Sequence, residues 1–162
     1  MGMSVIYAGT FDPLTLGHLD VIERIAGIFD HVVVAIAAES SRKQPLFTVA
    51  EREEMVRQSV GNVAHVEVDR FSGLLVNYAR KRAIHVLVRG IRAYSDFEYE
   101  FQMALTNRKL APDVETFFLM PKENYSFVSS STVKEVAASG GDTSEFVPPP
   151  VERFLIEKLH KR

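Results

Sequence analysis

Short runs of apolar residues recur along the 162-residue chain, and the segments between them have apolar residues spaced as on a helix. Most runs are rich in Val, Ile and Phe and lack strict alternation with polar residues, which is typical of strands buried on both faces. The pattern predicts strands in VIYA (5–8), VVVAIA (32–37), VAHVEV (63–68), VLVRG (86–90) and TFFLM (116–120).

The intervening segments carry helix signals. Thr48 and Glu51 have the spacing of a capping box, and Ser95 or Asp96 can cap a longer helix. Residues 74–83 form a third short pattern, and three prolines lead into a last one. The expected apolar stripes are Ile22, Ile25, Ala26 and Phe29; Phe97, Phe101, Ala104 and Leu105; and Val151, Phe154, Leu155 and Leu159.

The alternation of strand and helix predicts an α/β fold, with a doubly wound five-stranded parallel sheet and helices on both faces. No repeat, low-complexity tract or linker divides the chain, so we expect a single domain over residues 1–162. Ligands of such sheets bind beyond the carboxyl ends of the strands. The residues that follow each apolar run are therefore the candidates for function.

Composition narrows the classes of function. The net charge of −2 gives no bulk attraction to nucleic acid or to an anionic membrane, so we expect neither as a partner. The absence of cysteine excludes disulfides and thiolate metal sites and fits a reducing compartment. No signal peptide is visible, and the longest apolar run, residues 32–38, is too short to span a bilayer. We expect a cytoplasmic protein.

The turn GTFDPLTLGH, residues 9–18, follows the first expected strand. Gly9 lets the backbone leave the strand without a Cβ, and Thr15 is a plausible helix N-cap. That cap puts Gly17 and His18 in the first helical turn, where free N–H groups and the helix dipole favour phosphate. His18 adds a donor that can follow charge developing on a phosphoryl oxygen. The turn matches neither the Rossmann nor the P-loop glycine pattern.

Three other loops at the same expected edge carry groups that bind anions. Arg42 and Lys43 follow the second strand, Arg89 and Arg92 leave the fourth together, and Ser129 to Ser131 follow the fifth. Each has a plain structural explanation: a solvated loop, a salt bridge for a buried arginine, or a helix cap. The convergence of four such loops, with Thr10 and His18 in the first, favours a site that positions phosphates.

The chain offers no cysteine and no plausible Ser-His-Asp spacing for covalent catalysis, and no cluster has transition-metal ligand spacing. The other histidines, among them His31, His65 and His85, sit where strands begin or run, which favours structural roles. We therefore expect an enzyme that stabilises charge while a bound substrate acts as the nucleophile. Mg²⁺ is expected to arrive with a nucleoside triphosphate.

Two segments resemble the signatures of the nucleotidyltransferase superfamily. Residues 15–18, TLGH, resemble its [HT]xGH motif. Residues 128–134, VSSSTVK, resemble ISSTxxR, with Val128, Ser131 and Lys134 replacing Ile, Thr and Arg. The combination of GTFDPxTxGH, RGxRxxxDFEYE and SFVSSSxVKE is similar to the bacterial phosphopantetheine adenylyltransferase family, and the similarity runs from Val5 to about Leu159.

The resemblance implies a Rossmann-like nucleotidyltransferase fold and an activity. Such enzymes join ATP and 4′-phosphopantetheine to give dephospho-coenzyme A and pyrophosphate, by in-line attack without a covalent intermediate. It also implies coenzyme A as a feedback ligand and a homohexamer built as a trimer of dimers. Composition alone is merely compatible with an oligomer.

The resemblance also assigns residues. Thr10 would orient the attacking phosphate, His18 would stabilise the transition state, Lys43 and Arg89 would hold the acceptor phosphate, and Leu75 would line the pantetheine pocket. Arg92 would act as a further catalytic residue. The expected ATP contacts are Thr10, Phe11, His18, Gly90, Ile91, Arg92, Glu100, Tyr125, Ser126, Phe127, Val128, Ser129, Ser130 and Ser131.

Several alternatives stay open. In the loop SRKQP, counting back from PLF favours Lys43 for the acceptor phosphate, and counting forward from the strand favours Arg42; we predict Lys43. The acceptor could instead be nicotinamide mononucleotide or glycerol 3-phosphate, although the RGxRxxxDFEYE segment argues against this. A regulator that kept the fold without catalysis, or a purely structural domain, is disfavoured by Thr10, His18 and Arg92 and by polar clusters on every loop of one edge.

Overall fold

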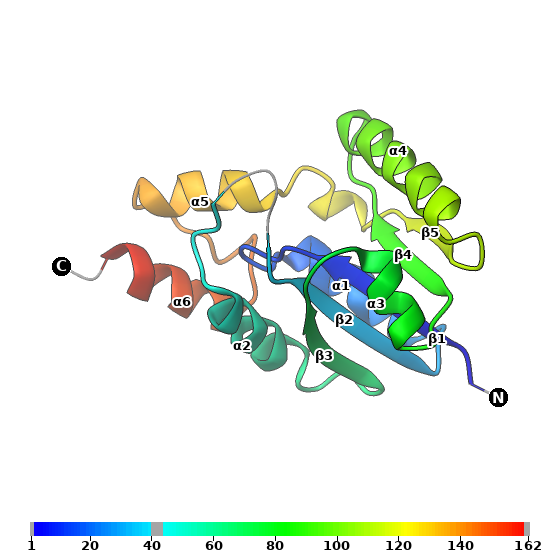
Figure 1. The fold of residues 1–162 in the computed structure, drawn as a ribbon. Helices are drawn as coiled ribbons and strands as arrows, with labels where there is room; N and C mark the ends of the chain where they lie inside the picture. Colours follow the sequence, from blue (N-terminus) through cyan, green and yellow to red (C-terminus); the bar gives the residue numbers. More distant parts are fainter. Residues whose placement is uncertain (1, 40–43, 161–162) are drawn as a thin grey trace.

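A five-stranded parallel sheet organises the computed structural model, which describes residues 2–39 and 44–160, with Tyr94 and Ser95 described by their backbone alone (Figure 1). Its strand order is β3-β2-β1-β4-β5, and every strand pair is parallel. The strands are β1 Ser4–Gly9, β2 His31–Ala37, β3 Val66–Phe71, β4 Val86–Gly90 and β5 Glu115–Leu119. The predicted fold class is confirmed.

Helices connect the strands, and two of them begin where the sequence predicts. Thr15 and Thr48 each form a complete capping box at the start of α1 and α2. The helices are α1 Leu16–Ala26, α2 Val49–Val60, α3 Leu75–Lys81, α4 Tyr94–Leu110, the 3-10 turn η1 Glu123–Tyr125, α5 Ser130–Ala138 and α6 Pro149–His160. None of the described helices is both long and apolar enough to cross a membrane.

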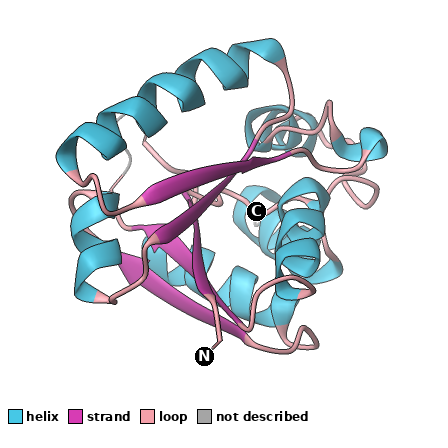
Figure 2. Ribbon diagram, turned by 90° about the vertical axis from the view of Figure 1, so that its right-hand side faces the viewer, coloured by secondary structure: helices cyan, strands magenta, loops and turns pink. Residues whose placement is uncertain are grey.

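The core lies on both faces of the sheet because alternate residues of β1 and β2 point to opposite sides. Val5, Val34 and Ile36 pack on one face with α1, α2, α5 and α6. Ile6 and Ala35 pack on the other with α3 and the segment that follows α4. Figure 2 shows helices on both sides of the twisted sheet. This double burial explains why these strands read as continuous apolar runs.

Two local predictions are wrong. The third strand starts at Val66 rather than residue 63, because residues 61–65 form a turn in which His65 takes a positive φ of 63°. Helix α4 starts at Tyr94 with Ala93 as N-cap, so Ser95 and Asp96 lie in its first turn. The apolar stripe of α4 does share one face, but that face is largely exposed, as in Phe97 and Phe101, each 46% exposed.

The connection pattern reverses direction between β1 and β4, which pair in the middle of the sheet. In doubly wound sheets this switch point leaves a crevice between the loops that follow the two strands. Here those loops are residues 10–15 and 91–93. The fold therefore brings the predicted Thr10–His18 turn next to the two arginines.

Candidate active site

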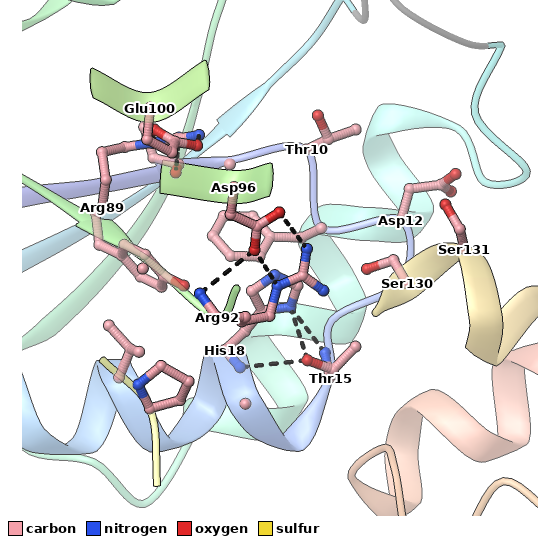
Figure 3. Close-up of a pocket in the computed structure, with 18 of the residues that line it drawn as sticks. Thr10, Asp12, Thr15, His18, Arg89, Arg92, Asp96, Glu100, Ser130 and Ser131 are labelled. Atoms are coloured by element: carbon pink, nitrogen blue, oxygen red, sulfur yellow. Dashed lines mark hydrogen bonds and ion pairs between the residues drawn. The ribbon is translucent and has the colours of Figure 1, made fainter. Parts of the chain in front are cut away.

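A cavity of about 420 Å³ opens at the carboxyl edge of the sheet (Figure 3). The end of β1 with the loop that follows it, the first turn of α1, the end of β4 and the start of α5 supply most of its wall, and Pro45 and Pro121 border it. Its polar lining residues are Thr10, Asp12, Thr15, His18, Arg89, Arg92, Asp96, Glu100, Ser130, Ser131 and Lys134. Three of the four predicted loops thus meet around one space.

The capping box at the start of α1 orients the His18 ring. The Thr15 N–H donates to His18 Nδ1 at 3.0 Å, and Thr15 Oγ1 accepts from the His18 N–H at 3.3 Å. A backbone N–H can only donate, so Nδ1 must be the unprotonated nitrogen of the ring. The proton of the neutral ring is therefore on Nε2, which makes that atom a hydrogen-bond donor.

The surroundings of His18 keep the ring neutral. Burial is the main cause, and the guanidinium groups of Arg92 and Arg89 add to it, so the pKa of His18 falls to about 3. The ring of Phe11 packs edge-on against it, with centroids 5.1 Å apart. A neutral Nε2–H donor stabilises developing negative charge without taking part in proton transfer.

Phe11 is itself held by tight local geometry. It has a positive φ of 50°, is buried, and covers Gly9, where a Cβ would come within 3.0 Å of the Phe11 ring. The predicted glycine requirement at position 9 thus has a specific cause, which is space for this ring. A Cβ at Gly90 would meet its nearest atom, the Tyr7 hydroxyl, at an ordinary 3.6 Å. Neighbouring protein atoms therefore impose no glycine at position 90.

The start of α1 is less open to anions than the sequence suggests. The Leu16 N–H donates to Phe146 O at 2.8 Å, and the His18 N–H is bound by its cap. The start of α5 borders the cavity as well. There Ser129 caps the helix through the Thr132 N–H, while Ser130 and Ser131 line the cavity.

Ser130 also fastens this end of α5 to the first loop. Its Oγ donates to the carbonyl of Pro13 at 2.8 Å, across 117 positions of sequence. The amino end of a helix carries partial positive charge, and here it is aimed at the cavity by that bond. The predicted serine cluster therefore has both a capping and a site-lining role.

Arg89, near the end of β4, and Arg92, in the loop that follows it, are both paired with carboxylates. Arg89 binds both oxygens of Glu100, at 2.8 and 2.6 Å, and donates to Ala8 O. Burial opposes the charge of Arg89, but the bonds to Glu100 outweigh it and raise its pKa. Arg92 binds Asp96 through Nε at 2.8 Å and Val128 O through Nη1 at 2.8 Å. The salt bridge that a half-buried arginine needs is thus supplied by Glu100.

Several cavity residues were missed as site residues in the sequence, among them Lys134, Asp12 and Asp96. Lys134 Nζ lines the cavity and lies 2.8 Å from Asp12 Oδ2. Asp12 is buried and also accepts from the N–H groups of Leu46 and Phe47, each at 2.9 Å. The position of Lys134 in the VSSSTVK segment could have signalled it, because the matching motif has an arginine there.

A second cavity, of about 790 Å³, adjoins the first. Leu75, the residue predicted to line the pantetheine pocket, borders it together with Phe71, Leu74 and Met103. The two cavities share a wall made of Ala8, Gly9, Thr10, Arg89, Arg92, Asp96 and Glu100. Groups bound in the two spaces would meet at Thr10 and the arginines.

The remaining predicted residues lie in several places. Lys43 and Arg42 fall outside the described residues. Val128 is buried in the core, Phe127 is 70% exposed, and Tyr125 packs near Gly17. Within residues 2–39 and 44–160, no group of three or more His, Asp or Glu side chains is placed to hold a metal ion.

The fold and its cation-lined edge define an α/β nucleotidyltransferase. Residues 6–136 match the cytidylyltransferase-like family. A phosphopantetheine adenylyltransferase of Desulforudis audaxviator (strain MP104C) is 55% identical over 97% of this chain and 96% of its own. A phosphopantetheine adenylyltransferase from Heliobacterium modesticaldum (strain ATCC 51547 / Ice1) is 52% identical over 94% of this chain and 90% of its own. The chain therefore belongs to the cytidylyltransferase-like family and, within it, to the phosphopantetheine adenylyltransferases.

Solved structures show the same fold at much lower identity. Plasmodium falciparum nicotinic acid mononucleotide adenylyltransferase complexed with NaAD superposes with a TM-score of 0.70 at 15% identity, covering 99% of this chain and 97% of that one. Its complex with APC gives 0.69 at 16% identity, with the same coverage. These likenesses concern the fold alone.

Proposed function

We propose that this enzyme transfers the adenylyl group of ATP to 4′-phosphopantetheine, giving dephospho-coenzyme A and pyrophosphate, and that residues 1–162 act as one nucleotidyltransferase domain. The observation that carries the proposal is the pair of adjoining cavities with a shared wall. Direct transfer between two bound substrates requires two spaces that meet at the reacting atoms. The names of the relatives at 52–55% identity support the choice of acceptor.

The chemistry of the walls supports one assignment of the substrates. The smaller cavity has His18, Lys134 and the start of α5, which suit the triphosphate of ATP. The larger cavity has Leu74, Leu75 and Phe71, which suit the pantetheine arm. Of the predicted ATP contacts in these segments, Gly90, Ser130 and Ser131 line only the smaller cavity, Arg92 lines the shared wall, and Ile91 and Ser129 line neither cavity.

In the proposed reaction an oxygen of the acceptor phosphate forms a bond to the α-phosphorus of ATP, while the bond from that phosphorus to the bridging oxygen breaks and pyrophosphate leaves. Thr10 orients the acceptor phosphate from the shared wall. His18 Nε2–H donates to the α-phosphoryl oxygens as charge builds on them. The arginine side chains have five N–H donors each, so Arg89 and Arg92 can bind phosphate while remaining paired to carboxylates.

Mg²⁺ is proposed to arrive with ATP. The carboxylates that border the site do not suit a resident metal, because Asp12, Asp96 and Glu100 are each bound to a cationic side chain. Mg²⁺ commonly keeps water and binds substrate phosphates instead of an all-protein cage. When bound, it would offset charge on the phosphates.

Lys43 is proposed to hold the acceptor phosphate, in preference to Arg42. Pro45 fixes its own φ and restricts Gln44, and Lys43 is the cation closer to this pair in the sequence. Pro45 borders the first cavity. Lys43→Ala should raise the KM for phosphopantetheine and spare that for ATP, and a larger defect in Arg42→Ala would shift the assignment by one residue.

We also propose a cytoplasmic homohexamer that coenzyme A inhibits. Coenzyme A carries the same pantetheine arm as the product, so the larger cavity suits it. The exposed apolar face of α4 supports assembly from copies of this chain, and it includes Phe97, Phe101 and Leu105.

One panel of acceptors tests the function. Pyrophosphate release from ATP is measured with phosphopantetheine, nicotinamide mononucleotide and glycerol 3-phosphate, each with Mg²⁺ and with a chelator. We expect release with phosphopantetheine and dependence on Mg²⁺. Turnover with nicotinamide mononucleotide and none with phosphopantetheine would refute the proposed acceptor. Lack of turnover with every acceptor would favour a regulator.

A further inference from the structure

Arg52, in the first turn of α2, is the largest fully buried side chain and is only 1% exposed. Within the described part of the chain its guanidinium has no carboxylate at ion-pair distance and binds four backbone carbonyls instead. Nη1 donates to Thr10 O at 2.7 Å and Ala37 O at 2.8 Å, Nη2 to Ala38 O at 3.3 Å, and Nε to Phe47 O at 3.2 Å.

Such a placement is expensive, because burial penalises the charged form of Arg52 and lowers its pKa. The charge of the Asp12 carboxylate opposes that shift. Asp12, however, is bonded to Lys134 and to two backbone N–H groups rather than to Arg52. The positive charge of Arg52 is thus balanced mainly by carbonyl dipoles.

The four carbonyls belong to two segments of the site, the loop after β1 and the connection from the end of β2 to α2. Thr10 directly follows β1, Ala37 ends β2, and Phe47 closes the loop that leaves β2. Asp12 joins the same two loops with the opposite sign, through the Leu46 and Phe47 N–H groups. Two clamps, one cationic and one anionic, therefore fix the β1 loop against residues 44–47.

The cationic clamp lies on the acceptor side. Thr10 and Ala37 both border the larger cavity, and Glu39 beside Ala38 borders it too. Of these three, only Thr10 also borders the smaller cavity. Loss of the clamp should therefore disturb the larger cavity more than the smaller one.

We propose that Arg52 is a positioning residue. It holds Thr10 and the two ends of the β2–α2 connection, residues 37–38 and 47, in the positions that binding of the acceptor phosphate requires. This rests on the proposed function. A guanidinium suits the task because its planar fork reaches carbonyls from two strands at once. Replacing an arginine that served only core stability would leave the ratio of the KM values for the two substrates unchanged.

Arg52→Met and Arg52→Lys test the proposal, with Arg57→Met as matched control. Arg57 is on the same helix and also donates to a strand carbonyl, Val68 O, but borders neither cavity. We expect Arg52→Met to raise the KM for phosphopantetheine about 10- to 100-fold and to lower kcat, with the KM for ATP changed less than about threefold. The KM for phosphopantetheine of Arg52→Lys should lie between those of the wild type and Arg52→Met. The kinetic constants of Arg57→Met should match those of the wild type.

Amide hydrogen exchange of residues 9–14 and 44–48 gives a readout that needs no turnover. We expect faster exchange there in Arg52→Met, or in Arg52→Lys if the methionine variant does not fold, with the sheet interior unchanged. Unchanged kinetics, or equal rises in both KM values, would overturn the role of Arg52. Wild-type enzyme that fails with phosphopantetheine would refute the proposed function instead, and the exchange data would still decide whether Arg52 holds the two loops.

Discussion

His18 performs two tasks with one ring, closing the capping box of α1 through Nδ1 and presenting Nε2–H as a donor. The N-cap is a local feature, so the sequence was enough to predict Thr15 at this position, but it did not show that the His18 ring closes the box. The choice of tautomer was not predictable, because it depends on the ring turning back to the Thr15 N–H. Backbone geometry thus selects which nitrogen of His18 carries the proton.

His18→Ala should lower kcat about 100- to 1000-fold, since loss of one preorganised donor typically costs about 3–4 kcal/mol in the transition state. The KM for ATP should change far less, because the donor acts as charge develops. Steady-state pyrophosphate release measures both constants. The matched control is His31→Ala, whose ring pairs with Glu67 away from the cavities. Retention of more than a tenth of kcat would reduce His18 to a helix cap.

The low pKa of His18 also makes stability depend on pH. In the unfolded chain the ring takes up a proton near pH 6.5, whereas in the folded protein it resists protonation down to about pH 3. Between these values the unfolded state binds more protons, so stability falls as the pH falls below 6.5. At pH 5 the cost from this group is about 2 kcal/mol.

Urea unfolding of wild type and His18→Gln at pH 7 and pH 5 measures this effect. Between pH 7 and pH 5 the free energy of unfolding of the wild type should fall by about 2 kcal/mol more than that of His18→Gln, because glutamine does not titrate. Equal losses would show that the folded-state pKa of His18 is close to its ordinary value.

At the scale of elements, the strand interiors and the two threonine caps could be predicted because they depend on neighbouring residues. The start of β3 could not, since it follows from the turn at His65 with its positive φ. Pairings across long separations were equally hidden. Lys134 meets Asp12 across 122 positions, a contact that only the packing of α5 against the first loop creates.

The structure also changes the interpretation of the predicted anion sites. The starts of α1 and α5 both line the cavity, but the Leu16 and His18 N–H groups of α1 are already bound by Phe146 and by the cap. Arg89 was predicted as either a phosphate ligand or a structural ion pair, and in the described structure it pairs with Glu100. Sequence can locate such a charge but cannot choose between its partners.

Lys134→Met should raise the KM for ATP about 10- to 100-fold, because a charged hydrogen bond contributes about 1.5–3 kcal/mol. Lys134→Arg should retain most of the affinity. Lys134→Met also leaves the buried Asp12 carboxylate without its cation, so the Tm of this variant should fall as well. Lys158→Met is the matched control, since Lys158 pairs with Glu51 on the surface. A fall in Tm with an unchanged KM would assign Lys134 a structural role only.

At the scale of the whole molecule, the two sides of the sheet differ in how well they are covered. The face under α1, α2, α5 and α6 has the larger buried cluster, and Figure 1 shows α4 along the β5 side of the sheet. Large apolar side chains on one face of α4 remain exposed, among them Phe97 and Phe101, whose rings stack 5.6 Å apart, and Leu105, 48% exposed. Extended patches of this kind usually mark a protein interface.

If this patch joins copies of the chain, Phe101→Glu should split the assembly, because a carboxylate in a desolvated contact is unfavourable. Light scattering coupled to size-exclusion chromatography should give a mass above one 18.2 kDa chain for the wild type and a smaller mass for the variant. Ile156→Glu is the matched control, since Ile156 on α6 is 54% exposed and lies outside the α4 patch. A monomeric wild type would contradict the hexamer, and equal masses for wild type and Phe101→Glu would move the interface away from α4. Because Met103 of α4 borders the larger cavity, dissociation should also weaken phosphopantetheine binding more than ATP binding.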